Sequence, residues 1–402
     1  MTDKSTSSLD AISAAGLSGG GSPLRDTIMS MKPHDIYEVA RIGLGMDDVI
    51  PLWFGESDFN TPEFIKDACK QALDDNKTFY SYARGVPEIR ASIIKYIKRI
   101  QGVEINDARI TMPGSTMLSI VLALECLITD GDNIVCVSPI WPNISQATKM
   151  LGGEPRHIRL EPRDSGWYLD LDRMFDACDA RTKAIFINSP GNPTGWIATK
   201  EEQLSILEFG RKNNIAIISD EVYNRLVYDG VAAPSFLNIT EPDDLVFIVN
   251  GFSKAYAMTG WRLGYMIAPE FMMNQLLMLA GVNNTGAPVF TQYGAVAALD
   301  HGEDFIKTMV DHCRNGRDIM MKATADSNRI KMIKPAGAFY AFIEIDGMTN
   351  SLEFAKHLMA TAKVGLAPGS AFGEGNESFV RICFAQEPAT LETALERLTA
   401  AL

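Results

Sequence analysis

Lys254 lies five residues after the apolar run LVFIV (245–249), and Arg262 follows eight residues later. The run is rich in β-branched residues and predicts a strand that is buried on both faces. A lysine just beyond such a strand either reaches the surface with its stem against apolar neighbours or is held in a pocket for chemistry. This segment alone favours a surface position for Lys254, so we examine the residues at the other strand ends to choose between the two interpretations.

Four more apolar runs are each followed by a cluster of polar, glycine or aromatic residues. The runs are ARITM, NIVCV, KAIFI and IAIIS, and the clusters that follow them are PGST (113–116), SPIWPN (138–143), NSPGNPTG (188–195) and DEVYNR (220–225). Amphipathic segments alternate with the runs, an order typical of a mostly parallel sheet covered by helices on both faces. Ligands of such folds bind at the carboxyl ends of the strands. We therefore expect the clusters to lie together at one edge.

One part of this edge is suited to an anion. Gly114, Ser115 and Thr116 open an apolar helix, and the N–H groups at a helix N-terminus bind phosphate. Arg262 adds a guanidinium that can clamp the same anion with two hydrogen bonds.

The other part is suited to an aromatic aldehyde. Trp141 offers a flat face, Asp220 suits a protonated ring nitrogen, and Lys254 can form a Schiff base. A phosphate, a protonatable ring and an aldehyde occur together in pyridoxal 5′-phosphate (PLP). Each feature alone is more often structural: PGST as a helix cap, NPTG as a turn, a tryptophan in the core, an aspartate as a cap. Their convergence at one edge favours the cofactor.

The motifs SPIWPN, NSPGNPTG, SDEVY and GFSKAYAMTGWRLG, in this order, resemble those of the class I aminotransferases, which are PLP enzymes of fold type I. The similarity begins at about Pro23 and includes GESDFNTPEFI (55–65) and FVRICFA (379–385). It implies an α/β fold with a large PLP-binding domain (63–300), whose mostly parallel sheet lies between helices. Residues 23–62 and 301–402 are expected to form a smaller α+β domain, after a flexible tail at 1–22.

The resemblance also implies roles for single residues. Lys254 matches the Schiff-base lysine that later acts as the base, and Asp220 matches the carboxylate that keeps the ring nitrogen protonated. The catalytic set is Lys254, Asp220 and Tyr223; the residues expected to bind the cofactor are Gly114, Ser115, Thr116, Trp141, Asn192, Asp220, Tyr223, Ser253, Lys254, Arg262 and Tyr80; those expected to bind the substrate are Arg381, Gly55, Asn192 and Trp141. In this family Asn192 and Tyr223 would donate to the phenolate oxygen of the ring, and Arg381 would take the substrate α-carboxylate.

Two positions stay open. Members of the family often have a tyrosine that crosses a dimer interface to the cofactor phosphate, and Tyr80 fits this role better than Tyr82. Some members also have a serine three residues before the lysine, where this chain has Gly251. Either Ser253 supplies that hydroxyl or the site lacks it. If Tyr80 crosses, each active site needs two subunits, and we expect a symmetric homodimer.

The expected activity is amino transfer between an α-amino acid and a 2-oxo acid by a ping-pong mechanism. Trp53 and Phe54, just before Gly55, favour a neutral or aromatic substrate side chain. Alternatives are an aspartate aminotransferase and a PLP-dependent carbon–sulfur β-lyase. A nicotinamide-dependent dehydrogenase would need a G-x-G-x-x-G motif after the first strand, and a PLP-binding regulator would need a nucleic-acid-binding module; the chain has neither.

Composition restricts the remaining possibilities. The 402 residues have a net charge of -13 and no basic block, which argues against nucleic acid and anionic membranes as partners. The six cysteines form no C-x-x-C pair, and the five histidines lack metal-ligand spacing, so we expect neither a disulfide framework nor a metal site. No secretion signal or long apolar run occurs, and a cytoplasmic location is expected.

Overall fold

The computed structural model describes residues 23–402, so the predicted tail at 1–22 lies outside the described residues. Residues 33–402 form one compact unit. The preceding segment contains the short helix α2 (Asp26–Met29).

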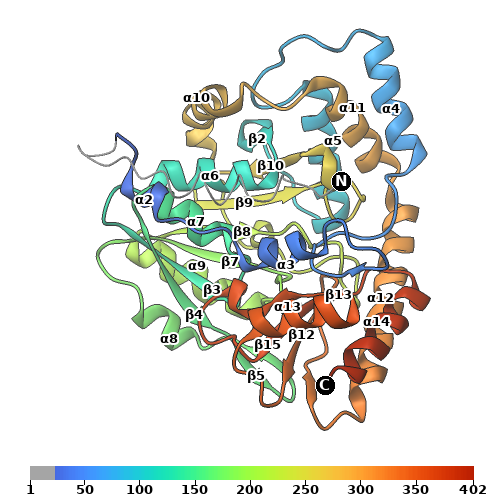
Figure 1. Cartoon of the computed structure of the whole chain (residues 1–402). Helices are drawn as coiled ribbons and strands as arrows, with labels where there is room; N and C mark the ends of the chain where they lie inside the picture. The colour runs from blue at the N-terminus through green and yellow to red at the C-terminus, as the bar shows by residue number, and fades with distance from the viewer. Residues whose placement is uncertain (1–22) are drawn as a thin grey trace. The chain divides into compact units, whose positions relative to one another are not determined.

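A seven-stranded sheet occupies the centre of residues 110–267, in the order β2-β10-β9-β8-β7-β3-β4 (Figure 1). The strands are β2 (Ile110–Gly114), β3 (Asn133–Ser138), β4 (Glu154–Arg159), β7 (Thr182–Asn188), β8 (Ala216–Asp220), β9 (Val246–Gly251) and β10 (Gly264–Ile267). Only β10 runs antiparallel to its neighbours β2 and β9, so the predicted mostly parallel sheet is confirmed. The sequence analysis missed β4, which is polar, and β10, which has four residues.

Alternate residues of the central strands enter two different hydrophobic clusters. In β7, Ile185 and Ile187 pack with one cluster, whereas Ala184 and Phe186 pack with the other. Helices therefore cover both faces, which explains why these strands are apolar throughout. One face carries α6 (Thr116–Leu127), α7 (Asn143–Met150) and α10 (Met273–Asn284). The other carries α5 (Pro87–Gln101), α8 (Leu171–Asp176), α9 (Lys200–Asn213) and α11 (Val289–His301), with α4 (Glu63–Asp74) against α11.

A second, antiparallel sheet lies in the C-terminal part, in the order β11-β12-β15-β14. Its strands are β11 (Ile330–Met332), β12 (Tyr340–Ile345), β14 (Ala367–Pro368) and β15 (Phe379–Cys383). The long helix α12 (Glu303–Ala325) and the last helix α14 (Pro388–Ala400) share one hydrophobic cluster with it, and α3 (Asp35–Gly43) and α13 (Ser351–Ala362) share another.

The segment after Pro33 returns to this C-terminal part. Strand β1 (Ile50–Pro51) pairs in parallel with β13 (Val364–Gly365), and α3 packs against α13. The exact domain boundaries stay a prediction. The remaining short elements are the hairpin β5 (Glu161–Arg163) and β6 (Gly166–Tyr168) and the 3₁₀ turns Asp107–Arg109, Phe236–Asn238, Thr259–Trp261, Glu270–Met272 and Gly369–Phe372.

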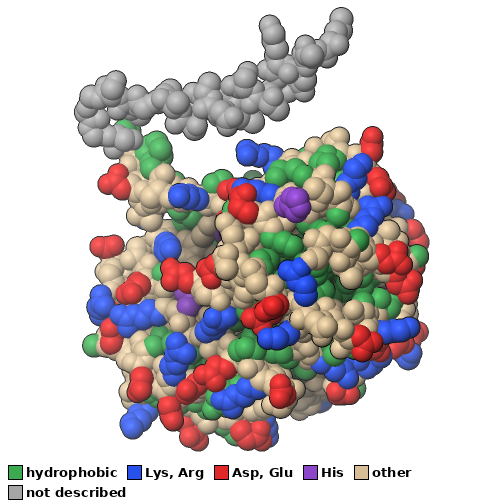
Figure 2. Space-filling model, turned by 60° about the horizontal axis from the view of Figure 1, so that its bottom comes forward, with side chains coloured by type: hydrophobic (Ala, Val, Ile, Leu, Met, Phe, Trp, Pro, Cys, Tyr) green, Lys and Arg blue, Asp and Glu red, His purple; other side chains and the backbone are tan. Residues whose placement is uncertain are grey.

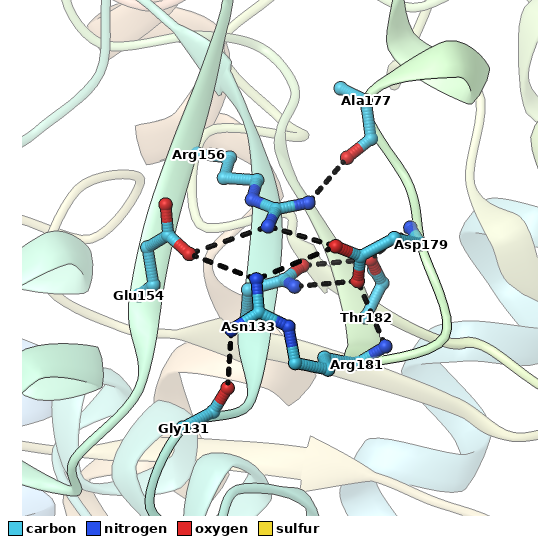
Figure 3. A network of polar contacts seen from close by, with 8 residues as sticks. All are labelled: Gly131, Asn133, Glu154, Arg156, Ala177, Asp179, Arg181 and Thr182. Atoms are coloured by element: carbon cyan, nitrogen blue, oxygen red, sulfur yellow. Dashed lines mark hydrogen bonds and ion pairs between the residues drawn. The ribbon is translucent and has the colours of Figure 1, made fainter.

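The amino ends of β3, β4 and β7 are held by a polar network (Figure 3). The buried Asn133 amide donates to Asp179 Oδ1 at 2.9 Å, and its oxygen accepts from Thr182 Oγ1 at 2.7 Å. Arg156 Nη2 lies 2.9 Å from Asp179 Oδ2. The hydrogen bond from Asn133, the Arg181 backbone N–H and the Arg156 guanidinium hold the pKa of the Asp179 carboxyl well below its usual range. The polar groups at this edge of the sheet thus satisfy one another.

Candidate active site

A cavity of about 220 Å³ lies at the carboxyl ends of the strands. The predicted site residues that line it are Gly55, Thr116, Trp141, Asn192, Asp220, Tyr223, Ser253, Lys254, Arg262 and Arg381. Lys254 thus lies in a pocket and not on the outer surface, which answers the choice left open by its own segment.

Lys254 is positioned by the turn that follows β9. Its Nζ donates to the backbone oxygen of Gly55 at 2.6 Å and lies 5.9 Å from the centre of the Tyr223 ring. Burial lowers the pKa of the amine to about 8, and the charges of Arg381 and Arg262 act in the same direction. An amine with this pKa is partly neutral near pH 7–8 and can act as a nucleophile or a base.

The backbone around Lys254 is unusual at two residues. Ala257 and Arg262 have φ values of 51° and 55°, a left-handed conformation that non-glycine residues rarely adopt. Thr61 Oγ1 donates to the Ala257 oxygen at 2.5 Å, and Arg262 donates to the Thr259 oxygen at 2.8 Å. These bonds fix the turn that carries both cations, and strained backbone of this kind is concentrated at functional sites.

Asp220 ends β8 and is buried, with the backbone N–H of Val222 as a donor at 3.2 Å. Burial raises the pKa of its carboxyl to about 7, although this hydrogen bond and Lys254 oppose the shift. Among the described residues no ion pair joins Asp220 to a cation. A ligand cation in the cavity would therefore favour its charged form.

Arg381, in β15, is buried and held from several sides. Its Nη1 donates to Asn192 Oδ1 at 3.0 Å and its Nη2 to the Trp53 oxygen, while Nε has no hydrogen-bond partner. The guanidinium lies 4.5 Å from the centre of the Tyr340 ring. No carboxylate of residues 23–402 forms an ion pair with Arg381. The group is thus oriented and available to bind an anion.

The N-terminus of α6 approaches β9 and β10 very closely. A Cβ at Gly251 would meet Thr116 Oγ1 at 2.3 Å, and one at Gly264 would meet the Thr116 nitrogen at 2.4 Å. A serine at position 251, as in some members of the family that the sequence resembles, would therefore clash here. Ser253 and Thr116 both line the cavity, and Ser253 can supply a hydroxyl instead.

Three predicted residues do not line the cavity. Ser115 is the N-cap of α6, and its hydroxyl accepts from the Leu118 N–H at 3.2 Å. Gly114 ends β2 just before it. Tyr80 is 93% exposed and Tyr82 is 68% exposed, in the segment between α4 and α5. Whether either reaches a neighbouring subunit stays a prediction.

Sequence reasoning missed several residues of the cavity wall. Asn188 accepts from the Asn192 N–H at 2.8 Å and so fixes the NPTG turn. Tyr340, at the start of β12, lies 2.7 Å from the Tyr223 hydroxyl. Neighbouring motifs could have indicated both: Asn188 opens NSPGNPTG, and Tyr340 lies in the apolar run GAFYAFIEI. His34 and Tyr37 lie far from any recognised motif, and only the fold brings them here.

The polar groups of the cavity fit pyridoxal phosphate. The partly neutral Lys254 suits an aldehyde, the buried Asp220 suits a protonated ring nitrogen, and Arg381 Nε is a buried donor without an acceptor. Within residues 23–402 no cluster of His, Cys, Asp or Glu could hold a metal ion.

Comparisons with known proteins agree with this chemistry. A family model described as aminotransferase class I and II matches residues 47–398. Aromatic-amino-acid aminotransferase 2 of Thermococcus litoralis is 32% identical over 379 residues, which are 93% of this chain and 97% of that protein. An aspartate aminotransferase of Pyrococcus abyssi is 33% identical over 381 residues, with 93% and 97% covered. The crystal structure of an aromatic aminotransferase from Pyrococcus horikoshii has a TM-score of 0.84 at 32% identity, and the match covers 90% of this chain and 98% of that one.

Proposed function

The chain belongs to the class I and II aminotransferases, and on that premise we propose that the cavity at the strand ends is its active site. The enzyme depends on pyridoxal phosphate and transfers an amino group between an α-amino acid and a 2-oxo acid. The observation that carries the proposal is the partly neutral lysine, Lys254, in one cavity with a buried carboxylate, Asp220, and a buried arginine, Arg381.

Each of these groups has a proposed task. When bound, pyridoxal phosphate supplies an aldehyde for the amino group and a ring that accepts electrons from the substrate α-carbon. Lys254 Nζ would hold the aldehyde and afterwards move the α-proton, for which a pKa near neutrality is favourable. Asp220 would accept a hydrogen bond from the protonated ring nitrogen, and Asn192 and Tyr223 would donate to the phenolic oxygen.

The phosphate is proposed to bind at the N-terminus of α6. Gly114, Ser115 and Thr116 would contribute backbone N–H groups, and Arg262 and Ser253 line the same cavity. The Ser115 hydroxyl caps the helix, so its backbone is the part of the residue that is left for an anion. Trp141, which lines the cavity, would offer its flat face to the ring.

The substrate carboxylate is proposed to bind Arg381 beside Gly55. Trp53 and Phe54 both line the cavity. Trp53 is buried and its backbone oxygen accepts a hydrogen bond from Arg381, whereas Phe54 is 41% exposed. Other apolar lining residues include Ile36, Tyr37, Met117, Ile120 and Val222. The lysines and arginines that line the cavity are Lys254, Arg262 and Arg381, which all have tasks above. This lining favours a neutral or aromatic side chain over a second carboxylate.

Aspartate remains the second candidate substrate, because relatives such as the Pyrococcus abyssi protein are named aspartate aminotransferases. The two candidates are separated by following the visible spectrum of the purified protein as single amino acids are added without any oxo acid. Phenylalanine or methionine should change the cofactor absorbance once, with one equivalent of oxo acid formed per site. A strong preference for aspartate would contradict the neutral pocket. Continued release of ammonia and oxo acid would mean a lyase.

The functional unit is proposed to be a symmetric homodimer. Besides Tyr80, the exposed apolar side chains include Phe79 and Tyr82 in the same segment and Met278 and Val282 on α10. Gly286, just after α10, packs on the backbone of Ala83, so the two groups lie near each other on the surface. Apolar side chains grouped in this way are typical of a protein interface.

Hybrid dimers test both the dimer and the tyrosine. The variants Tyr80→Phe and Lys254→Ala should each have low activity. Mixed under conditions of subunit exchange, they should regain activity, because one site of each hybrid then has an intact lysine and an intact partner tyrosine. Tyr82→Phe is the matched control. If Tyr82→Phe, and not Tyr80→Phe, loses activity and regains it in hybrids with Lys254→Ala, then Tyr82 is the crossing residue. A protein that is a monomer in solution would contradict both the dimer and the crossing tyrosine.

The location is proposed to be the cytoplasm. All six cysteines are free thiols, which suits a reducing compartment. On the face in Figure 2, acidic and basic side chains are interspersed, and no helix of residues 23–402 is long and apolar enough to cross a membrane. Cell fractionation with an antibody to the protein tests the proposal, and recovery outside the soluble fraction would contradict it.

A further inference from the structure

Tyr340 is a buried tyrosine in the cavity wall to which the sequence assigned no task. It is the first residue of β12, in the C-terminal antiparallel sheet, and its side chain is fully buried. Its hydroxyl lies 2.7 Å from the hydroxyl of Tyr223, which follows β8 of the large sheet. The pair is therefore a direct polar contact between the two sheets at the active site.

Two further contacts fix the position of Tyr340. The Arg381 guanidinium lies 4.5 Å from the centre of its ring, which orients the cation over the aromatic face. A Cβ at Gly55 would lie 2.0 Å from the Tyr340 oxygen, so the glycine backbone packs directly against this hydroxyl. Tyr340 thus touches three residues with proposed tasks in the reaction.

The protons of the tyrosine pair can be assigned. Burial raises the pKa of both hydroxyls above the usual value, so both keep their protons at neutral pH. Each phenol has a single proton to donate. If Tyr223 donates to the phenolic oxygen of the cofactor, it cannot donate to Tyr340 as well. The bond of 2.7 Å must then run from Tyr340 to Tyr223.

We propose that Tyr340 is a positioning residue that acts through Tyr223: its hydroxyl donates to the Tyr223 oxygen and directs the Tyr223 proton toward the cofactor. The inference rests on the proposed function, since it takes the hydrogen bond from Tyr223 to the cofactor as given. Hydrogen bonds in a chain polarise one another, so the donor behind Tyr223 strengthens the bond in front of it. A stronger bond favours negative charge on the phenolic oxygen.

The test is a spectroscopic pH titration of the enzyme with bound cofactor. In Tyr340→Phe the pH midpoint of the visible absorption change should rise by about 0.5 to 1 unit, because the negative oxygen loses support. Tyr228→Phe is the matched control: the Tyr228 hydroxyl is also buried and donates to the Ala338 oxygen at 2.6 Å, but it does not line the cavity. Its midpoint should equal that of the wild type.

A double variant shows whether Tyr340 acts through Tyr223. Tyr223→Phe should raise the midpoint more than Tyr340→Phe does, and adding Tyr340→Phe to it should raise the midpoint no further. Full additivity would overturn the proposal, because Tyr340 would then act on the cofactor independently. An unchanged midpoint in the single variant Tyr340→Phe would overturn it as well.

A second route avoids dependence on one variant. Gly55→Ala keeps the Tyr340 hydroxyl but displaces it from Tyr223, so the midpoint should rise in this variant too. Thermal unfolding of the cofactor-free proteins identifies any variant that does not fold. If the wild type has no titrating visible band, the proposed function fails together with this inference. If the wild type titrates normally while Tyr340→Phe matches it, the inference alone fails, whatever the midpoint of Gly55→Ala.

Discussion

Polar groups at the two ends of the seven-stranded sheet differ in whether they have partners within the protein. At the amino ends of β3, β4 and β7, Asn133, Asp179 and Arg156 satisfy one another, and the pKa of the Asp179 carboxyl is lowered (Figure 3). At the carboxyl ends, burial raises the pKa of Asp220 to about 7 and lowers that of Lys254 to about 8. The polar groups at the amino edge have their partners within the protein, whereas those at the carboxyl edge gain theirs only with a ligand.

The physical reason is the same at both edges. Parallel strands bring backbone ends and turn residues together, and charges gathered there must be paired, hydrated or neutralised. The amino edge pairs them and contributes to stability. The carboxyl edge leaves them separated, which costs stability and keeps the groups available for chemistry.

The largest difference between the two edges is expected when one lysine at each edge is replaced by alanine. Lys254→Ala should reduce the rate of the half-reaction with an amino acid by at least about 10⁴-fold, because one group is both nucleophile and base. Lys183→Ala is the control: Lys183 lies at the amino edge, 3.5 Å from Asp132, and is partly exposed. Single-turnover absorbance measures both. Equal losses would contradict the assignment.

Asp220→Asn should reduce the same rate by about 10²- to 10³-fold, since a neutral amide cannot hold the ring nitrogen protonated. The variant keeps the shape of the side chain, so the cofactor should still bind. Stopped-flow traces of the half-reaction measure the loss. A rate equal to that of the wild type would mean that another residue serves the ring nitrogen.

The same residue should give the cofactor-free protein a distinctive pH dependence. Folded Asp220 keeps its proton up to about pH 7, whereas in the unfolded chain it loses the proton near its usual value of 3.8. Between these values the folded state binds more protons, so its free energy of unfolding falls as pH rises. Asp220→Asn lacks this fall, so its free energy of unfolding relative to that of the wild type should rise by on the order of 4 kcal/mol between about pH 4 and pH 8.

Urea unfolding from pH 4.5 to 8 measures the difference between Asp220→Asn and the wild type. Asp179 affects the pH dependence of stability in the opposite direction. Its lowered pKa contributes to the free energy of unfolding at pH above the usual pKa of the carboxyl, and this contribution is lost as the pH falls toward the pKa in the folded state. If the difference in free energy of unfolding between Asp220→Asn and the wild type does not change with pH, the claim that the carboxyl edge holds an unpaired, buried Asp220 is contradicted.

At the amino edge, Asn133→Ala should lower the free energy of unfolding by about 1–3 kcal/mol, because Thr182 and Asp179 lose a buried partner. The rate of amino transfer by the folded enzyme should stay unchanged. Urea unfolding and the half-reaction rate measure the two effects. A variant with wild-type stability and a slower reaction would reverse the roles of the edges.

The smallest effect is expected from Glu154→Gln in the same network. Glu154 lies 3.4 Å from Arg156 and 3.9 Å from Arg181, but all three groups are partly solvated. Exposed ion pairs contribute less than about 1 kcal/mol. Urea unfolding at low and high salt measures the change, and a loss as large as that of Asn133→Ala would mean that exposed charges stabilise this edge.

The sequence by itself determined the chemistry of this protein. Five apolar runs with polar clusters behind them predicted a parallel sheet and one ligand-binding edge, since strand alternation and turn residues are local properties. Lys254 and Asp220 could be named because each lies at the end of a strand or within a few residues of it, whereas Asn192 depended on the family resemblance. Arg381 and Gly55 depended on the family resemblance.

Only the tertiary structure decided which distant segments complete the cavity. His34 and Tyr37 come from the segment before the large sheet, and Tyr340 comes from the C-terminal sheet. No local pattern separates them from ordinary core or surface residues. Strand β10 shows the same limit, because its four residues are fixed by pairing with β2 and β9 and not by their own periodicity. The 2.7 Å contact between Tyr223 and Tyr340 depends on how the two sheets pack, and packing between distant segments is not encoded in local spacing.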